Sequence, residues 1–269
     1  MRTKKFFFVC LGVILLLATL FCTTYIGNYN PNKHLYKNNT KSLSVIIPLA
    51  PNETAWKNLI KDFAKLPDGT EILFVTSNKT KHSHELINLP QKKVYWLKST
   101  PGRANQMNAG AQSAKGEYLW FLHADSKFDE HTIPALLHSI QNYPNSLLFF
   151  DLAFLNDATP LMYLNAFGAR FRSRILNVPF GDQGFCINKK LFNKLNGFPE
   201  GLAYGEDHVF VWKARQQGVP IQPTGATLYT SARKYKEHGW LKTTITTQYL
   251  WIKQALPEIR KLYSEMKIL

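Results

Sequence analysis

Cysteine is scarce in this sequence, and so are acidic side chains. Three cysteines occur in 269 residues, and two of them, Cys10 and Cys22, lie in an apolar N-terminal stretch. The rest of the chain keeps one thiol, Cys186, which excludes a disulfide-stapled module and a cysteine-based zinc site. Eighteen Asp and Glu stand against 33 Lys and Arg, while 45% of residues are hydrophobic. That apolar content excludes a disordered basic tail, so the chain is expected to fold.

Charge is missing altogether between residues 6 and 32. Segment 6–27 approaches the roughly 20 apolar residues that a helix needs to span a bilayer. It follows a basic tail, residues 1–5, and precedes an Asn- and Lys-rich stretch, residues 28–41, that is typical of a flexible stalk. We interpret 6–27 as a single-pass transmembrane anchor, with a cleaved signal peptide or a buried core helix as the alternatives. The cations before the span favour a cytoplasmic N-terminus, but the side of the membrane stays open.

Beyond residue 42, short apolar runs alternate with amphipathic stretches. The runs predict strands over 43–48, 71–76, 93–97, 117–122 and 147–154. Helical spacing or composition predicts helices over 56–65, 103–115, 131–142, 189–195 and 205–217. This alternation predicts one α/β domain over residues 42–269, with a mainly parallel central sheet and helices on both faces. The domain keeps 27 cations and 18 acidic residues, so it is itself basic.

Two residues at predicted element ends suggest a diphosphate site. Ligands of such sheets bind beyond the carboxyl ends of the strands. Asp125 follows the run 117–122 and offers a carboxylate to Mg²⁺ or Mn²⁺, although a turn or a helix cap is the alternative. Arg103 begins a helix after Pro101-Gly102 and offers its guanidinium to a diphosphate. With a nucleotide-sugar as substrate, the two would form a clamp for the leaving group.

A second acidic site lies at Glu206-Asp207, where a helix is predicted to begin. Carboxylates at a helix start are stabilised by the helix dipole, which is the structural interpretation. The functional interpretation is a general base that takes the proton of an acceptor hydroxyl. The basic cluster 231–238 is either a solvated face or a flap over the diphosphate.

Several spaced motifs, taken together, resemble the family 2 glycosyltransferases and their GT-A fold, a Rossmann-like nucleotide-sugar fold. They occur in the family's order: 44–48 with Asn52-Glu53, 102–110, 121–125, 181–184, 197–200, Glu206-Asp207 and 231–234. Segment 102–110 with His123-Ala124-Asp125 is similar to a bacterial branch often labelled arsenosugar-biosynthesis glycosyltransferases.

The resemblance implies roles for individual residues. Asp207 is the expected catalytic base with Glu206 beside it, and Asp125 is the expected ligand of Mn²⁺ or Mg²⁺. The residues expected to bind the donor are Pro48, Glu53, Arg103, Gln106, Asn108, His123, Arg233 and Lys234. Asp182 and Gln183 are expected to border the acceptor.

The expected activity is that of a membrane-anchored, inverting glycosyltransferase that moves a sugar from a nucleoside-diphosphate donor to an acceptor hydroxyl. The acceptor is not identified; a lipid-linked one is consistent with stretch 240–269, an amphipathic helix that either lies on a membrane or packs on the domain. A nucleotidyltransferase is one alternative, although residues 48–54 lack the expected lysine. A tethered, inactive basic binding module is another, although Asp125 and Asp207 are both present. No nucleic-acid partner is expected, since a basic domain is common without one.

Overall fold

The computed structural model of the chain describes residues 41–78 and 87–266. The predicted basic tail and anchor, and all of the predicted stalk except its last residue, therefore lie outside the described residues. Within the described part, no helix is both long enough and apolar enough to cross a membrane.

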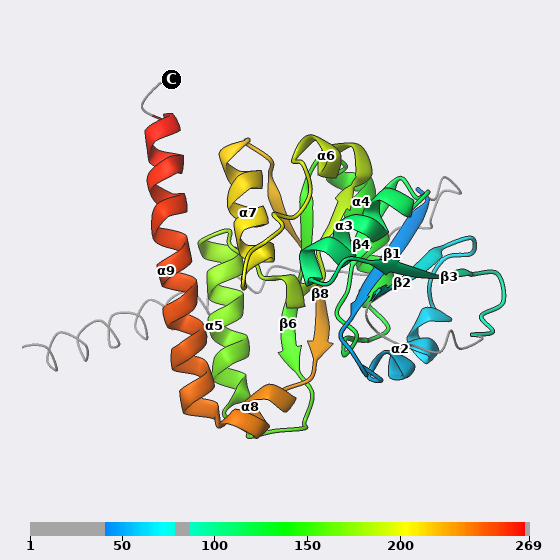
Figure 1. Cartoon of the computed structure of the whole chain (residues 1–269), viewed down its shortest axis with the longest axis horizontal. Coiled ribbons are helices and arrows are strands. Elements are labelled where there is room, and N and C mark those ends of the chain that lie inside the picture. The colour runs from blue at the N-terminus through cyan, green and yellow to red at the C-terminus, as the bar shows by residue number, and fades with distance from the viewer. Residues whose placement is uncertain (1–40, 79–86, 267–269) are drawn as a thin grey trace, which may run out of the picture. The chain divides into compact units, whose positions relative to one another are not determined.

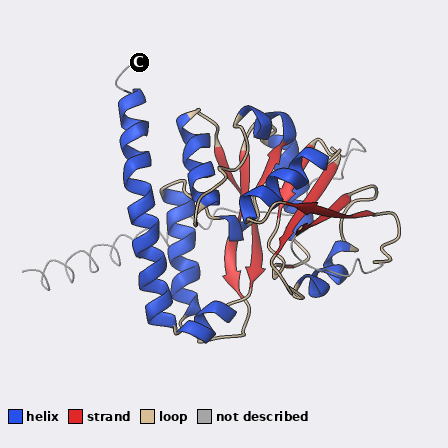
Figure 2. Ribbon diagram, in the orientation of Figure 1, coloured by secondary structure: helices blue, strands red, loops and turns tan. Residues whose placement is uncertain are grey.

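One eight-stranded sheet with the order β3-β2-β1-β4-β7-β6-β8-β5 forms the centre of the described residues (Figures 1 and 2). Its strands are β1 (Leu43–Leu49), β2 (Glu71–Ser77), β3 (Lys93–Ser99), β4 (Tyr118–Phe121), β5 (Lys127–Phe128), β6 (Leu147–Phe154), β7 (Cys186–Asn188) and β8 (Ile221–Thr230). Strands β7 and β5 run antiparallel to their neighbours, and the other pairs are parallel. The sheet is therefore mixed, but of the strands described only β5 and β7 are reversed, so it is mainly parallel as predicted. The two reversed strands are too short to produce a periodic sequence signal.

Both faces of the sheet are buried under helices, as predicted. The helices are α2 (Trp56–Phe63), α3 (Arg103–Ser113), α4 (Thr132–Asn142), α5 (Met162–Ile175), α6 (Lys189–Lys194), α7 (Glu206–Gln216), α8 (Arg233–His238) and α9 (Trp240–Met266). In β1, Val45 and Ile47 point into a core with α2 and α4, whereas Ile46 points into a second core with α3 and α7. Burial on both faces explains why the strands are unbroken apolar runs in the sequence.

Strand β8 has no counterpart among the predicted elements. Its sequence contains Pro223 and Gly225, which interrupt the apolar pattern. Both residue types are depleted in strand interiors, so the segment does not look like a strand. The strand nevertheless pairs with β6 through a register shift between Phe149 and Asp151, and an irregularity of this kind accommodates a proline. Residues 181–184, one of the motifs that carry the family resemblance, contain a short 3₁₀ helix, η1 (Gly181–Gln183).

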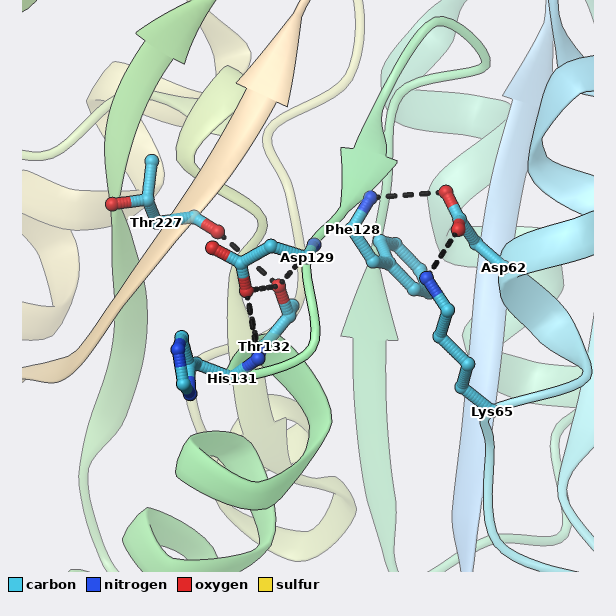
Figure 3. A network of polar contacts seen from close by, with 7 residues as sticks. All are labelled: Asp62, Lys65, Phe128, Asp129, His131, Thr132 and Thr227. Atoms are coloured by element: carbon cyan, nitrogen blue, oxygen red, sulfur yellow. Dashed lines mark hydrogen bonds and ion pairs between the residues drawn. The ribbon is translucent and has the colours of Figure 1, made fainter. Parts of the chain in front are cut away.

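A polar network holds the segment after β4 in place (Figure 3). Asp62 of α2 is buried and accepts a hydrogen bond from the Phe128 backbone N–H at 3.0 Å. Asp129 accepts from the backbone N–H of Thr132 at 2.9 Å, which satisfies a free donor at the start of α4. The Thr132 hydroxyl also lies 3.2 Å from the Thr227 carbonyl oxygen of β8. These bonds tie α2, β5, α4 and β8 together.

Candidate active site

Most of the predicted site residues gather at the edge of the sheet where the parallel strands end. Strand β1 leads to Glu53 and strand β4 leads to His123 and Asp125, while Arg233 follows β8. Pro48 lies within β1 itself, paired with Val75 of β2. The N-terminal ends of α3 and α7 and the short helix η1 add the remaining charged side chains.

Five of these side chains form what we call the buried charge cluster: Arg103, His123, Asp182, Glu206 and Asp207. Arg103 Nε lies 3.0 Å from Glu206 Oε1, and Arg103 Nη2 lies 3.5 Å from Asp207 Oδ2. These are ion pairs without hydrogen-bond alignment. The Gly181 backbone N–H also donates to Asp207 Oδ2, at 2.5 Å.

Glycine is required at position 181 by the close approach of this cluster. A Cβ on Gly181 would lie 2.5 Å from Arg103 Nη2 and 2.8 Å from Asp207 Oδ2. Both distances are shorter than van der Waals contact, so a larger residue would push the ion pair apart.

The protonation states in the cluster follow from burial and neighbouring charges. Burial opposes ionisation of Asp207, but Arg103 and the Gly181 N–H outweigh it and hold the pKa of Asp207 below its ordinary value. Burial, reinforced by Arg103, lowers the pKa of His123 to about 3. At neutral pH the cluster therefore holds an ionised carboxylate beside a neutral imidazole. The start of α7 further favours the negative charge.

Asp182 behaves in the opposite way. Burial raises the pKa of Asp182 to about 6, with Arg172 acting against the rise and Asp207 adding to it. Its Oδ1 atom is buried and has no hydrogen-bond partner among the residues that the structure describes.

Arg172 packs its guanidinium over the Phe180 ring at 3.4 Å and donates to the Val178 carbonyl oxygen at 3.0 Å. Arg172 had no predicted role; its only signal is a charge within an apolar stretch.

Beside the cluster lies what we call the open cleft, about 610 Å³ in volume and lined by Asp125, Asp157, Ser231, Arg233 and the first turn of α2 with the residues before it. Asp125 accepts from the Thr230 hydroxyl at 3.3 Å, and burial raises the pKa of its carboxyl group. The buried charge cluster itself encloses a cavity of only about 10 Å³. That is room for roughly one water molecule, so of the two sites it is the open cleft that has room for a substrate of nucleotide size.

Glu53 positions Arg233 at this cleft. Its Oε1 accepts from the backbone N–H groups of Thr54 and Ala55 at 2.9 and 2.8 Å, and its Oε2 lies 3.2 Å from Arg233 Nη2. Burial opposes ionisation, but the Ala55 N–H and Arg233 keep the pKa of Glu53 below its ordinary value. Lys234, the next residue in the chain, is exposed.

The turn before Arg233 is held by Asp157, a residue that the sequence argument passed over. Asp157 accepts from the Ser231 hydroxyl at 2.5 Å and from the Ala232 backbone N–H at 2.9 Å. Since Asp157 follows β6, the strand-end rule applied to the other strands would have found it.

Three residues that were predicted to bind substrate donate hydrogen bonds from their side-chain amides to backbone carbonyl oxygens. Gln106 donates to the carbonyl oxygens of Leu49 and Val75, both at 2.7 Å, which ties the ends of β1 and β2 together. Asn108 donates to the Phe198 carbonyl oxygen at 2.9 Å. Gln183 donates to the Phe150 carbonyl oxygen at 2.8 Å. These bonds position the site's backbone, and direct contacts of the three side chains with substrate stay predictions.

The residues present can hold a divalent cation only with help from the substrate. Across residues 41–78 and 87–266, no three His, Cys, Asp or Glu side chains form a metal-binding group. Asp125 supplies one carboxylate at the cleft. Mg²⁺ commonly uses one or two carboxylates together with substrate phosphates and water, so the donor set fits a cation that binds with a diphosphate.

Comparison with known proteins agrees with this geometry. The family model described as glycosyl transferase family 2 matches residues 44–195. No curated protein matches the sequence.

Solved structures share the fold. S. aureus TarS 1–349 is 20% identical with a TM-score of 0.55; the match covers 71% of this chain and 60% of that one. The same protein in complex with UDP-GlcNAc matches with 20% identity and a TM-score of 0.53, over 71% and 58% of the two chains. GalNAc-T7 with UDP, GalNAc and Mn²⁺ is 15% identical with a TM-score of 0.54, over 73% and 45%. The matched part is thus less than two thirds of each neighbour's length.

Proposed function

Because this chain belongs to glycosyl transferase family 2, we propose that it is a metal-dependent, inverting glycosyltransferase that uses a nucleoside-diphosphate-sugar donor. The observation that carries the proposal is the position of Asp207. It is an ionised carboxylate at the start of α7, beside the end of β4 and next to an open cleft large enough for a nucleotide.

The donor binds in the open cleft, with its diphosphate toward Arg233 and Arg103. Guanidinium groups bind phosphate oxygens through paired, charge-assisted hydrogen bonds. Two structural neighbours support a uridine-diphosphate donor, since one was solved with UDP-GlcNAc and another with UDP, GalNAc and Mn²⁺. A cation held by Asp125 would supply further positive charge for the leaving diphosphate.

Asp207 acts as the general base. It accepts the proton of the acceptor hydroxyl while that oxygen forms a bond to the anomeric carbon and the bond from that carbon to the diphosphate breaks. One displacement of this kind inverts the configuration, and no second carboxylate is needed as nucleophile. Asp182, next to Asp207 in the cluster, borders the acceptor.

Arg103 links donor binding to the strength of the base. Its ion pairs with Glu206 and Asp207 are not aligned as hydrogen bonds, so an incoming diphosphate competes for the guanidinium. Moving Arg103 toward the diphosphate removes a positive charge from Asp207 and raises the pKa of the base. A carboxylate with a higher pKa is a stronger proton acceptor.

The predicted anchor, residues 6–27, completes the proposal as the attachment of this enzyme to a membrane, with a lipid-linked molecule as one acceptor. The anchor lies outside the described residues, and the side of the membrane on which the enzyme acts is left to experiment.

Release of free nucleoside diphosphate tests the function. The full-length chain in detergent is incubated with a panel of nucleotide-sugars, with and without Mn²⁺. We expect metal-dependent release from one donor, and its loss in Asp125→Asn. Glu130→Gln is the matched control, since it removes one negative charge from an exposed side chain outside the cleft.

Each result has a defined meaning. Turnover that survives Asp125→Asn would remove Asp125 from the proposal. Failure of every donor to bind, with or without metal, would favour the inactive binding module. Binding without turnover, in the presence of a suitable acceptor panel, would contradict catalysis.

A further inference from the structure

Helix α9 carries two adjacent apolar stripes. In the first, Ala255 lies in the core that also contains α7, and Ile259 and Leu262 pack against that core. In the second, five large apolar side chains are half exposed or more: Leu241, Ile245, Tyr249, Ile252 and Leu256. Their spacing of three or four residues places them in one stripe along the helix. The sequence left two alternatives for this helix, membrane contact or packing on the domain, and α9 has a separate apolar stripe for each.

Helix α5 lies beside α9 and adds a second exposed stripe (Figure 1). Asn165 of α5 donates to the Thr244 hydroxyl at 3.1 Å and accepts from Trp240 Nε1 at 2.6 Å. The exposed apolar side chains of α5 and the residue that follows it are Tyr163, Leu164, Phe167, Ile175 and Leu176. We call the two stripes together the α5–α9 face.

The two stripes are joined by a groove of about 400 Å³. Ile175 and Leu176 line it from the α5 side, and Ile252 and Leu256 line it from α9. In the described part of the chain, most of the exposed large apolar side chains lie on this face. An exposed apolar surface of this extent marks an interaction site.

A row of cations borders the apolar stripe of α9. Lys242, Lys253 and Arg260 are exposed, and their spacings of eleven and seven residues place them in one column on the helix. Among the described side chains of α5 and α9, the only carboxylate is Glu258. It is buried, and it accepts hydrogen bonds from Gln216 and Lys261 at 2.9 and 2.7 Å. The described side chains of this face therefore offer no free carboxylate as a counter-charge.

The partner of this face must supply both apolar contact and negative charge. Residues 1–41 contain six cations and no acidic residue, so the N-terminal segment does not supply the charge. A second copy of the chain would bring the same cations to the interface. An anionic lipid bilayer supplies both properties, since its headgroups pair with the cations and its acyl chains contact the apolar stripe.

We propose that the α5–α9 face lies in the headgroup region of an anionic bilayer, with α9 parallel to the membrane plane. Helix α9 has 27 residues and so presents about 40 Å of surface, and no described helix is apolar enough to cross the membrane instead. The proposal rests on this surface alone and stands whether or not the chain is a transferase.

Fluorescence quenching by lipid tests the proposal in the full-length chain. Cys10 and Cys22 are replaced by serine, which leaves Cys186 as the remaining native thiol. Cys186 is buried, and burial raises the pKa of its thiol, so it reacts poorly. An environment-sensitive label is attached through Tyr249→Cys or, as the matched control, through Tyr143→Cys on an exposed tyrosine elsewhere. Both proteins are mixed with phosphatidylglycerol vesicles that carry a nitroxide on the acyl chains.

The label at position 249 is expected to lose most of its fluorescence, and the label at position 143 is expected to keep it. In phosphatidylcholine vesicles the quenching at 249 should fall. The triple variant Lys242→Gln, Lys253→Gln, Arg260→Gln should lose it too, since each cation removed weakens the association about fivefold. Lys115→Gln, Lys190→Gln, Lys194→Gln removes the same charge elsewhere and should change nothing.

Three outcomes would overturn the proposal. Equal quenching at both positions would mean that lipid contact is not specific to this face. A label at 249 that is shielded from water but not quenched, at any protein concentration, would mean that residues 6–27 cover the face. Shielding that disappears on dilution would mean that a second copy covers it.

Discussion

The buried charge cluster and the open cleft lie next to each other, but they differ in how strongly they stabilise an ionised carboxylate. In the cluster, Asp207 is enclosed, is held by Arg103 and the Gly181 N–H, and has a lowered pKa. At the cleft, Asp125 has one long hydrogen bond to Thr230 and a raised pKa. Arg233, which pairs with Glu53, is more than half exposed.

This difference indicates a division of labour. Groups that are already fixed in place lose little entropy in the reaction and suit the chemical step. Arg233, exposed and held by one ion pair, can rearrange around a ligand and suits binding. Substitutions of the cluster's carboxylates should therefore lower kcat, and substitutions of Glu53 and Arg233 beside the open cleft should mainly raise the KM for the donor.

Asp207→Asn should have the largest effect. The amide keeps the shape of the side chain but cannot take a proton, so kcat should fall about 10²- to 10⁴-fold while the donor KM changes little. Glu206→Gln is the matched control, since it removes the neighbouring charge and leaves the base. Initial rates over a range of donor concentrations separate the two parameters. An equal loss in both variants would show that the pair acts through its total charge.

Gly181→Ala should break the geometry of the buried charge cluster without changing any charge. The new methyl group would lie 2.5 Å from Arg103 Nη2, and crowding of this kind destabilises a protein by about 1–3 kcal/mol. We expect a lower melting temperature and a lower kcat. Gly168→Ala, where a Cβ meets nothing within 4 Å, is the control. Unchanged kcat in Gly181→Ala would mean that the spacing between Arg103 and Asp207 is not critical.

Asp182→Asn tests how much the burial of an ionised Asp182 costs, through the pH dependence of stability. The folded chain holds the pKa of Asp182 at about 6, above the ordinary value of 3.8. Below about pH 4 the group is protonated in both states and costs nothing; as pH rises to about 6 the unfolded chain releases its proton first, so stability falls. Well above pH 6 the variant should therefore be more stable by about 3 kcal/mol, or about 6–12 °C in melting temperature.

Melting temperatures of the variant and the parent chain at pH 4 and pH 7.5 test this. The difference should be present only at the higher pH. A variant that is less stable at pH 7.5 would show that the attraction between Asp182 and Arg172 outweighs the cost of burial.

Glu53→Gln should have the smallest effect on stability. The ion pair with Arg233 is open to water on the arginine side, where the side chain is 56% exposed, and pairs near the surface contribute about 0–1 kcal/mol. The donor KM should nevertheless rise, because Arg233 loses the group that orients it, while kcat is unchanged. Chemical denaturation and donor titration measure the two quantities. A fall in kcat with an unchanged KM would mean that Glu53 contributes to the chemical step and not to donor binding.

The first half of the sheet was predictable because its physics is local. Strands β1, β2 and β4 are buried on both faces, so each is a continuous apolar run, and α2 between β1 and β2 shows amphipathic spacing. Strand β8 was not predictable because Pro223 and Gly225 mask its pattern, and its pairing with β6 links residues about 75 positions apart in the chain.

The site residues show the same contrast between local sequence signals and long-range contacts. Asp125 and Glu53 follow strand ends, and Arg103 and Asp207 lie at predicted helix starts, so both placements need only the sequence. The family resemblance then selected Asp207 over Glu206 as the expected base. The sequence did not tell that Gln106, Asn108 and Gln183 bond to main-chain carbonyl oxygens. An amide side chain looks the same in a sequence whether it meets a ligand or a backbone group.

Composition and periodicity alone determined that the chain has a basic α/β body and a long uncharged N-terminal segment, since both follow from residue type and spacing. Only the tertiary structure decided that Arg103 pairs with Glu206 and Asp207, and that α9 turns one apolar stripe outward beside α5. Those properties depend on which surfaces meet across the fold. Separation along the chain carries little information about such distances.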